Sequence, residues 1–124
     1  MVKLASALVV DDSATQAKAT AATLARAGYD PVLVATDWAE CRAFLAVKAP
    51  DLVVLDVRMG GQMGADVMLP QLRRFPGCAE SRFVLYSAIK PADLAAIAKR
   101  CNADGCIAKG NEEAFVSLCV RLVP

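Results

Sequence analysis

The amino-acid sequence contains no histidine among its 124 residues. This absence excludes catalysis by a histidine acid or base, Ser–His and Cys–His nucleophiles, and metal sites with imidazole ligands. Any chemistry in this chain must therefore come from carboxylates, hydroxyls, thiols, lysine and arginine.

The sequence also lacks any Cys-x-x-Cys pair, although it has five cysteines, at positions 41, 78, 101, 106 and 119. Only Cys101 and Cys106 lie close together, and their spacing matches no zinc-ligand pattern, so we expect no zinc site. In a cytoplasmic chain, an odd number of cysteines favours reduced and mostly buried thiols over a disulfide framework.

Long hydrophobic runs and a charge bias are absent as well. No apolar run approaches the roughly 18 residues that a membrane-spanning helix needs, and the short run 4–10 leads directly into two aspartates without a small-residue cleavage site. We therefore expect a soluble, cytoplasmic protein without a signal peptide or membrane association. Lys and Arg number 14 against 13 Asp and Glu, a net charge of +1, which lacks the basic bias of nucleic-acid-binding domains.

Short apolar runs alternate with helix-favouring segments along the whole chain. The pattern predicts strands at 4–10, 31–35, 51–56, 82–86 and 106–108, and helices at 13–27, 38–49, 65–75, 91–101 and 112–122. Ser13, Asp37 and Asn111 are placed to cap three of these helices, whereas Pro70 would cost the third helix about 3 kcal/mol unless that helix kinks or starts late. Apolar strands that alternate with helices predict an α/β fold, a doubly wound parallel sheet of five strands, and the five units fill residues 1–124 as one domain.

Polar side chains stand at the ends of four of the five predicted strands. Asp11 and Asp12 follow the first strand, Asp56 the third, Ser87 the fourth and Lys109 the fifth. Because the carboxyl ends of parallel strands meet at one edge of the sheet, we expect these side chains to converge there.

Three neighbouring carboxylates need a positive partner. At about 4 Å each pair repels by about 4 kcal/mol at an effective dielectric constant near 20. Lys109 can offset part of this repulsion, and a hard divalent cation such as Mg²⁺, which favours oxygen ligands, can offset more. Such a pocket suits a phosphoryl group, because the cation and the lysine would neutralise its oxygens while Ser87 and backbone N–H groups donate hydrogen bonds. The nucleophile would then be a carboxylate.

Four segments together resemble the receiver domain of response regulators, the phosphoacceptor module of two-component signalling. Residues 9–13 (VVDDS) resemble the acidic pair after the first strand, and residues 55–59 (LDVRM), followed by Gly64, resemble the phosphorylation loop. Residues 86–88 (YSA) resemble the hydroxyl and alanine after the fourth strand, and residues 103–109 (ADGCIAK) resemble the segment with the family's lysine. The resemblance covers essentially the whole chain and implies a flavodoxin-like (βα)5 fold with strand order 2-1-3-4-5.

The resemblance implies a signalling switch that is not an enzyme beyond its own phosphorylation and dephosphorylation. Asp56 would accept a phosphoryl group from a histidine kinase or a phosphotransfer protein. Asp12 would bind Mg²⁺ directly and Asp11 mainly through water, and the backbone carbonyl of Arg58 would complete the protein ligands.

The resemblance also assigns the residues that would handle the bound phosphoryl group. Lys109 would pair with it, and Ser87, followed by Ala88, would close on it. The side chains of Arg58 and Ile89 occupy places that tune phosphoryl lifetime in the family. The face formed by 91–101, 106–108 and 112–122 would change its affinity for a downstream protein target.

Three positions depart from the family pattern. Gly60 stands where the family usually has proline, so this loop should be looser, and Cys106 stands where an aromatic ring often couples to the hydroxyl residue. Gly110 stands where proline usually follows the lysine through a cis bond. A cis bond before a residue other than proline costs about 3 kcal/mol, so we expect Lys109–Gly110 to be either trans with a shifted loop or cis under strain.

These departures leave a second function open, that of a degenerate receiver acting as a phosphorylation-independent protein-binding module. A small flavodoxin-like enzyme is a further alternative. It would need a phosphate cradle rich in Gly, Ser or Thr after the first strand, where Asp11 and Asp12 stand instead. The sequence also leaves open whether the chain is a stand-alone regulator, a phosphate relay or sink, or a piece of a larger protein.

Overall fold

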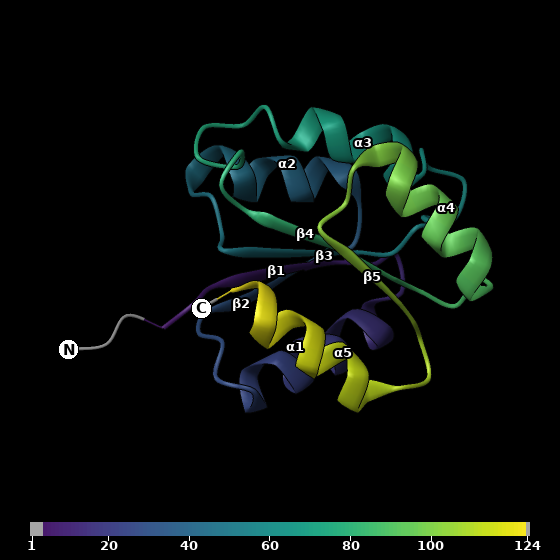
Figure 1. The fold of residues 1–124 in the computed structure, drawn as a ribbon. Helices are drawn as coiled ribbons and strands as arrows, with labels where there is room; N and C mark the ends of the chain where they lie inside the picture. Colours follow the sequence, from purple (N-terminus) through teal and green to yellow (C-terminus); the bar gives the residue numbers. More distant parts are fainter. Residues whose placement is uncertain (1–3, 124) are drawn as a thin grey trace.

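The computed structural model describes residues 4–123, which form one parallel sheet between two helical layers (Figure 1). The strands are β1 (Ala7–Val10), β2 (Val32–Ala35), β3 (Leu52–Leu55), β4 (Arg82–Ser87) and β5 (Gly105–Ala108). The helices are α1 (Ala14–Arg26), α2 (Trp38–Val47), α3 (Ala65–Leu72), α4 (Pro91–Cys101) and α5 (Glu112–Leu122). Residues 1–3 and 124 of the expected domain lie outside the described residues.

The sheet has the strand order β2-β1-β3-β4-β5, with every neighbouring pair parallel. This confirms the predicted fold class and the order that the family resemblance implies. The reversal of strand order falls between β1 and β3, whose carboxyl ends therefore border a crevice, the usual place for a functional site in such sheets.

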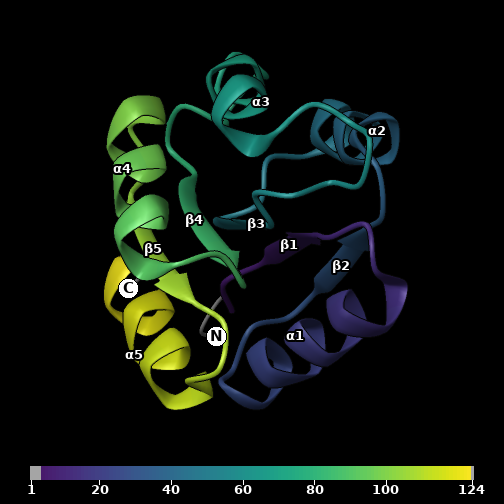
Figure 2. The ribbon, with the colours of Figure 1, turned by 90° about the vertical axis from the view of Figure 1, so that its right-hand side faces the viewer.

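The two faces of the sheet build two separate hydrophobic cores. Helices α2, α3 and α4 cover one face, and α1 and α5 cover the other (Figure 2). Along β1, Leu8 and Val10 point into the first core, while Ala7 and Val9 point into the second. Each fully buried Leu or Val side chain contributes about 1.5–3 kcal/mol, which is why the central strands are apolar on both faces.

The predicted capping residues start three of the helices. The side-chain oxygens of Ser13, Asp37 and Asn111 accept hydrogen bonds from the backbone N–H three residues later, at 3.3, 2.7 and 3.0 Å. Each such cap contributes about 1 kcal/mol. These caps fix where α1 and α5 begin, and both helices start directly after the polar strand ends that border the crevice.

Helix α3 is shorter than the sequence predicts, since it ends at Leu72 rather than at Phe75. Pro70 lies inside it and has no N–H to donate to the carbonyl of Asp66, so the helix continues for only two residues beyond the proline. Beyond Leu72 the chain tightens into three-residue turns, in which Phe75 N donates to the Leu72 carbonyl at 3.2 Å.

The Lys109–Gly110 peptide bond is trans. Between residues 4 and 123, Asp30–Pro31 is the one cis peptide bond. Gly110 has φ +118°, a backbone conformation that residues with a Cβ rarely adopt. Of the two geometries expected at this bond, the structure thus has the trans form, and glycine allows the chain to turn directly into the cap at Asn111.

Within residues 4–123, every helix is too short or too polar to cross a membrane.

Candidate functional site

Three carboxylates gather at the carboxyl ends of β1 and β3. Asp11 and Asp12 follow β1 and Asp56 follows β3, and one carboxylate oxygen from each lies within 4.8 Å of the others. Asp11 is buried, Asp12 is exposed, and the side chain of Asp56 is 13% exposed. The cluster is therefore open to solvent on the Asp12 side, and Asp56 remains reachable from the crevice.

Lys109, at the end of β5, supplies the positive charge of the pocket. Its Nζ donates to Asp11 Oδ2 at 2.8 Å and to Asp56 Oδ2 at 3.3 Å. Burial lowers the pKa of Lys109, but the hydrogen bond to Asp11 and the charges of Asp56 and Asp11 outweigh this effect and raise the pKa above its usual value. The lysine thus carries its charge into the acidic cluster.

Asp56 has a hydrogen-bond donor on each of its carboxylate oxygens. Ser87 Oγ, at the end of β4, donates to Asp56 Oδ1 at 2.8 Å, and the backbone N–H of Arg58 donates to the same oxygen at 3.2 Å. Lys109 takes the other oxygen. Because Ser87 is only 1% exposed, this arrangement holds the carboxylate in one orientation.

The loop after β3 lies directly against Asp12. A Cβ atom on Gly60 would lie closer to Asp12 Oδ2 than real side chains come, and Gly60 has φ +38°. Glycine at this position therefore lets the backbone approach the carboxylate. The sequence marked Gly60 as a departure from the family pattern, and the structure shows what the missing side chain makes room for.

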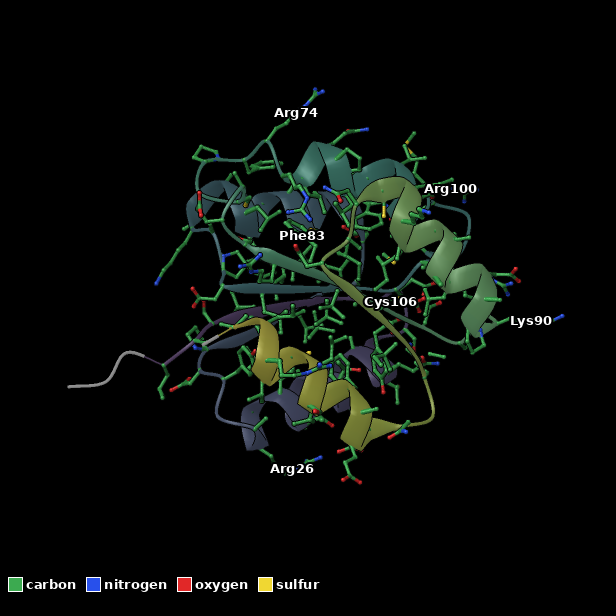
Figure 3. All side chains as sticks on the ribbon, in the orientation of Figure 1. Arg26, Arg74, Phe83, Lys90, Arg100 and Cys106 are labelled. Carbon is green, nitrogen blue, oxygen red and sulfur yellow. The ribbon has the colours of Figure 1, made fainter. Side chains whose placement is uncertain are left out.

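The remaining predicted residues lie around this centre. The Arg58 side chain and Ala88 are exposed, while Ile89 and Cys106 are partly buried and pack against the core under α2, α3 and α4. Cys106 lies on β5 (Figure 3), and burial raises the pKa of its thiol. The structure therefore brings Ile89 and Cys106 into the core beside the pocket rather than into its hydrogen bonds.

Two contacts of the site were not predicted from the sequence. Gln16 Oε1, in the first turn of α1, accepts a hydrogen bond from Lys109 Nζ at 2.6 Å. Trp38 Nε1, at the start of α2, donates to the Met63 carbonyl at 2.7 Å, which ties the loop after β3 to α2. No pattern in the sequence singled out Gln16, because Thr15 is also polar and lies in the same first turn of α1.

The donor set fits a hard divalent cation. Carboxylate and carbonyl oxygens are the ligands that Mg²⁺ prefers, and it commonly keeps several waters. Two oxygens bound to one Mg²⁺ lie at most about 4.2 Å apart, so oxygens within 4.8 Å of one another fit a mixture of direct and water-mediated ligands after a small adjustment. The acidic cluster therefore could hold such an ion.

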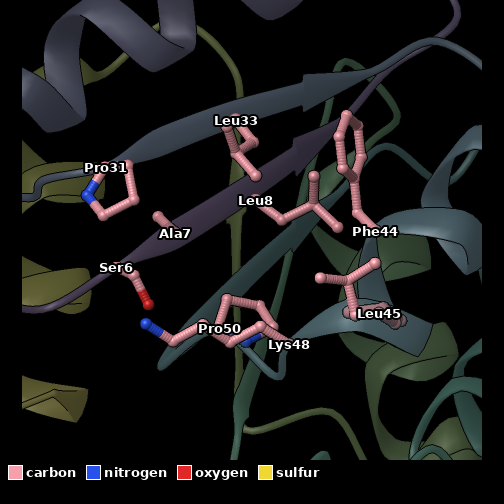
Figure 4. A pocket seen from close by; sticks show the side chains of 10 residues that line it. Ser6, Ala7, Leu8, Pro31, Leu33, Phe44, Leu45, Lys48 and Pro50 are labelled. Atoms are coloured by element: carbon pink, nitrogen blue, oxygen red, sulfur yellow. The ribbon is translucent and has the colours of Figure 1, made fainter.

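A second concave feature lies at the opposite end of the sheet. It is an apolar groove of about 410 Å³ between the amino-terminal ends of β1 and β2 and the end of α2 (Figure 4). Leu8, Leu33, Phe44 and Leu45 form much of its surface. The described lining contains none of the predicted site residues, so this groove is separate from the acidic cluster.

Comparisons with known proteins agree with this geometry. The family model for the response regulator receiver domain matches residues 7–118. The chemotaxis response regulator CheY4 of Vibrio cholerae is similar in structure, with a TM-score of 0.85 at 24% sequence identity over 98% of this chain and 100% of that chain. A CheY-like receiver domain from Methylobacillus flagellatus has a TM-score of 0.83 at 21% identity, over 97% of this chain and 99% of that chain.

The signal receiver domain of a histidine kinase from Syntrophus aciditrophicus has a TM-score of 0.80 at 28% identity, over 95% of this chain and 89% of that chain. No curated protein sequence matches the chain. The family match rests on nearly the whole chain, and the structure places its acidic cluster, hydroxyl and lysine at one edge of the matching fold. The chain therefore belongs to the response regulator receiver domain family.

Proposed function

We propose that this chain is a phosphoacceptor switch in which Asp56 takes a phosphoryl group from a histidine kinase or a phosphotransfer protein. The observation that carries the proposal is the placement of Asp56, whose two carboxylate oxygens are held by Ser87 and Lys109 beside Asp11. Residues 1–124 would form one such receiver domain. Its cytoplasmic location, as expected from the sequence, would be shared with the donor.

In the proposed reaction a carboxylate oxygen of Asp56 attacks the phosphorus of a phosphohistidine in the donor protein. The new P–O bond makes an acyl phosphate, while the P–N bond breaks and its electron pair stays on the donor's imidazole. Lys109, 3.3 Å from Asp56 Oδ2, would stabilise the negative charge on the transferred oxygens. Positioning and charge stabilisation account for most of the catalysis in such transfers.

We further propose that Mg²⁺ is the cofactor, held by Asp12 directly, by Asp11 mainly through water, by Asp56 and by the carbonyl of Arg58. When bound, it would neutralise part of the charge of the phosphoryl oxygens. The exposure of Asp12 leaves an open path for a hydrated ion, and Lys109 remains paired with Asp11 on the buried side of the cluster.

The switch itself would start at Ser87. Its hydroxyl now donates to Asp56 Oδ1 at 2.8 Å, and a phosphoryl group on Asp56 would offer it new acceptor oxygens. Ser87 ends β4, and the chain continues through Ala88 and Ile89 to α4, so movement of Ser87 would bias the face formed by α4, β5 and α5 toward a protein target. Because Cys106 replaces the usual aromatic ring, this coupling would not use the rotation of an aromatic side chain.

The structure favours this function over a degenerate receiver. Three departures raised the alternative, Gly60, Cys106 and Gly110. The pocket is assembled with all three in place, because Lys109 reaches both Asp11 and Asp56. Arg58 and Ile89 would then tune the lifetime of the phosphoryl group from their places beside the pocket. We propose protein partners and no direct contact with nucleic acid, since the net charge is only +1.

The test is incubation with Mg²⁺ and a small acyl phosphate, followed by intact mass spectrometry. We expect the wild-type chain to gain one phosphoryl group, and Asp56→Asn to gain none because its amide is a poor nucleophile. Asp93→Asn, which changes an exposed aspartate on α4, is the matched control and should label like wild type. An unlabelled wild-type chain, or equal labelling of Asp56→Asn, would contradict the proposed function.

A further inference from the structure

All three donors of the Lys109 ammonium have an oxygen acceptor in this structure. Two of these acceptors are the carboxylates of Asp11 and Asp56, and the third is the amide oxygen of Gln16. The contact with Gln16 has the shortest distance of the three, 2.6 Å against 2.8 and 3.3 Å. Three oxygen acceptors thus hold the ammonium of Lys109, and one of them comes from α1.

We infer that Gln16 is a positioning residue for Lys109. Its amide oxygen holds the ammonium of Lys109 so that one N–H points at Asp56 before phosphoryl transfer. This inference rests on the proposed function. When a phosphoryl group occupies Asp56, the bonds to Gln16 and Asp11 can remain while the third N–H turns to a phosphoryl oxygen. Gln16 therefore prepares the lysine without competing for that N–H.

The backbone around Gln16 is tied to the acidic pair. Gln16 N donates to Ser13 Oγ at 3.3 Å, and Ser13 N donates to Asp11 Oδ1 at 3.0 Å. The start of α1 is therefore linked to Asp11, which is the other fixed acceptor of the lysine. These hydrogen bonds fix the backbone of Gln16, so its side-chain amide approaches the ammonium from α1.

The backbone of the lysine is fixed, but its long side chain needs support of its own. The Lys109 backbone N–H donates to the Ser87 carbonyl at 2.8 Å, whereas Gly110, which follows, has no side chain to pack beside the lysine. The position of the ammonium then depends on the acceptors that the side chain reaches. Gln16, on α1, and Asp11, at the end of β1, supply two of them.

The neutral amide also fits the charge of the site. Three carboxylates already face the pocket, and a phosphoryl group would add further negative charge. A glutamate at position 16 would accept the same hydrogen bond but would repel the incoming phosphodonor. An amide oxygen therefore orients the lysine without adding to this repulsion.

The first test compares Gln16→Met, which keeps the length of the side chain but loses the acceptor, with wild type. We expect the rate constant for Mg²⁺-dependent phosphorylation by a small acyl phosphate to fall about tenfold, the effect of one hydrogen bond to a charged group. The affinity for beryllofluoride, which mimics the phosphoryl group on an aspartate, should fall by a similar factor. Gln16→Ala carries the same expectation if the methionine side chain disturbs the pocket.

The second test reads the lysine itself through the ¹⁵N NMR signal of its ammonium group. A fully hydrogen-bonded ammonium exchanges its protons slowly, so we expect a Lys109 signal in wild type and in Gln16→Glu, and its loss in Gln16→Met. A merely structural role for Gln16 would leave this signal unchanged. Thr15→Val, an exposed neighbour on α1, is the control and should resemble wild type in both tests.

The outcomes separate the inference from the proposed function. An unlabelled wild-type chain would overturn the proposed function. A labelled wild-type chain with an equal rate and an unchanged ammonium signal in Gln16→Met would overturn the role of Gln16 alone. A reduced rate together with a lost signal, and a signal restored in Gln16→Glu, would support it.

Discussion

Replacing Gly60 by alanine tests whether the loop after β3 shapes the metal site. The new Cβ would come closer to Asp12 Oδ2 than real Cβ atoms come to any neighbour. The carboxylate of Asp12 must therefore move away, because the backbone of Gly60 is set by the loop and the end of a side chain moves more easily. Asp12 is the residue that we propose as a direct ligand.

The size of the effect follows from the coordination of Mg²⁺. The ion requires oxygen ligands at about 2.0–2.1 Å in near-octahedral geometry, so a displaced Asp12 carboxylate would be a poorer ligand for it. Changes to groups that only support a ligand already weaken metal binding about 10- to 100-fold. We therefore expect Gly60→Ala to weaken Mg²⁺ binding at least about tenfold, or about 1.4 kcal/mol.

Isothermal titration calorimetry measures the Mg²⁺ affinity of each variant, and Gly61→Ala is the matched control. Gly61 has φ +73° and nothing within 4 Å of its Cβ position, whereas Gly60 has φ +38° and meets Asp12. Both variants should lose about 1–2 kcal/mol of unfolding free energy to the left-handed backbone, but only Gly60→Ala should lose Mg²⁺ affinity. Equal affinities in wild type and both variants, or an equal loss in Gly61→Ala, would show that the Gly60 backbone does not control the Asp12 ligand.

Two further predictions concern stability. Trp38→Phe removes the donor that bonds the Met63 carbonyl at 2.7 Å, so the unfolding free energy should fall by about 0.5–1.5 kcal/mol. Urea denaturation followed by circular dichroism measures this loss, and an unchanged midpoint would contradict the contact. Burial raises the pKa of Cys41 and of Cys119 from 9.0 to about 12. The stability gained by burying these two protonated thiols is therefore fully present below pH 9, where both the folded and the unfolded chain keep the thiol proton. It is lost as the pH rises toward 12, by about 1.4 kcal/mol per pH unit for each thiol. Denaturation between pH 8 and 11 should show this slope, and a flat profile would count against it. The partly buried Cys106 should react first with a thiol reagent in the native protein.

Most of the fold could be predicted from the sequence because its signals are local. The caps at Ser13 and Asn111 act within three residues, and the alternation of apolar runs with helical segments reveals the five βα units. The end of α3 was mispredicted even though Pro70 is a local signal inside the helix, because how far a helix continues past a proline also depends on tertiary contacts. Arg73, the first residue beyond the helix, bonds Asp104 at 3.1 Å and lies over the Phe83 ring at 4.7 Å, and both partners come from later parts of the chain.

The order of residues along the chain specifies which polar side chains end the strands. It therefore predicts that Asp11, Asp56 and Lys109 meet, because all parallel strands finish at the same edge of the sheet. Two features follow from the packed fold alone: Gln16 completes the hydrogen bonds of Lys109, 93 residues away, and the loop at Gly60 lies against the Asp12 carboxylate. Such contacts depend on how a helix and a loop sit over the sheet to within about an ångström. That placement results from the packing of the whole core, which no local pattern of residues records.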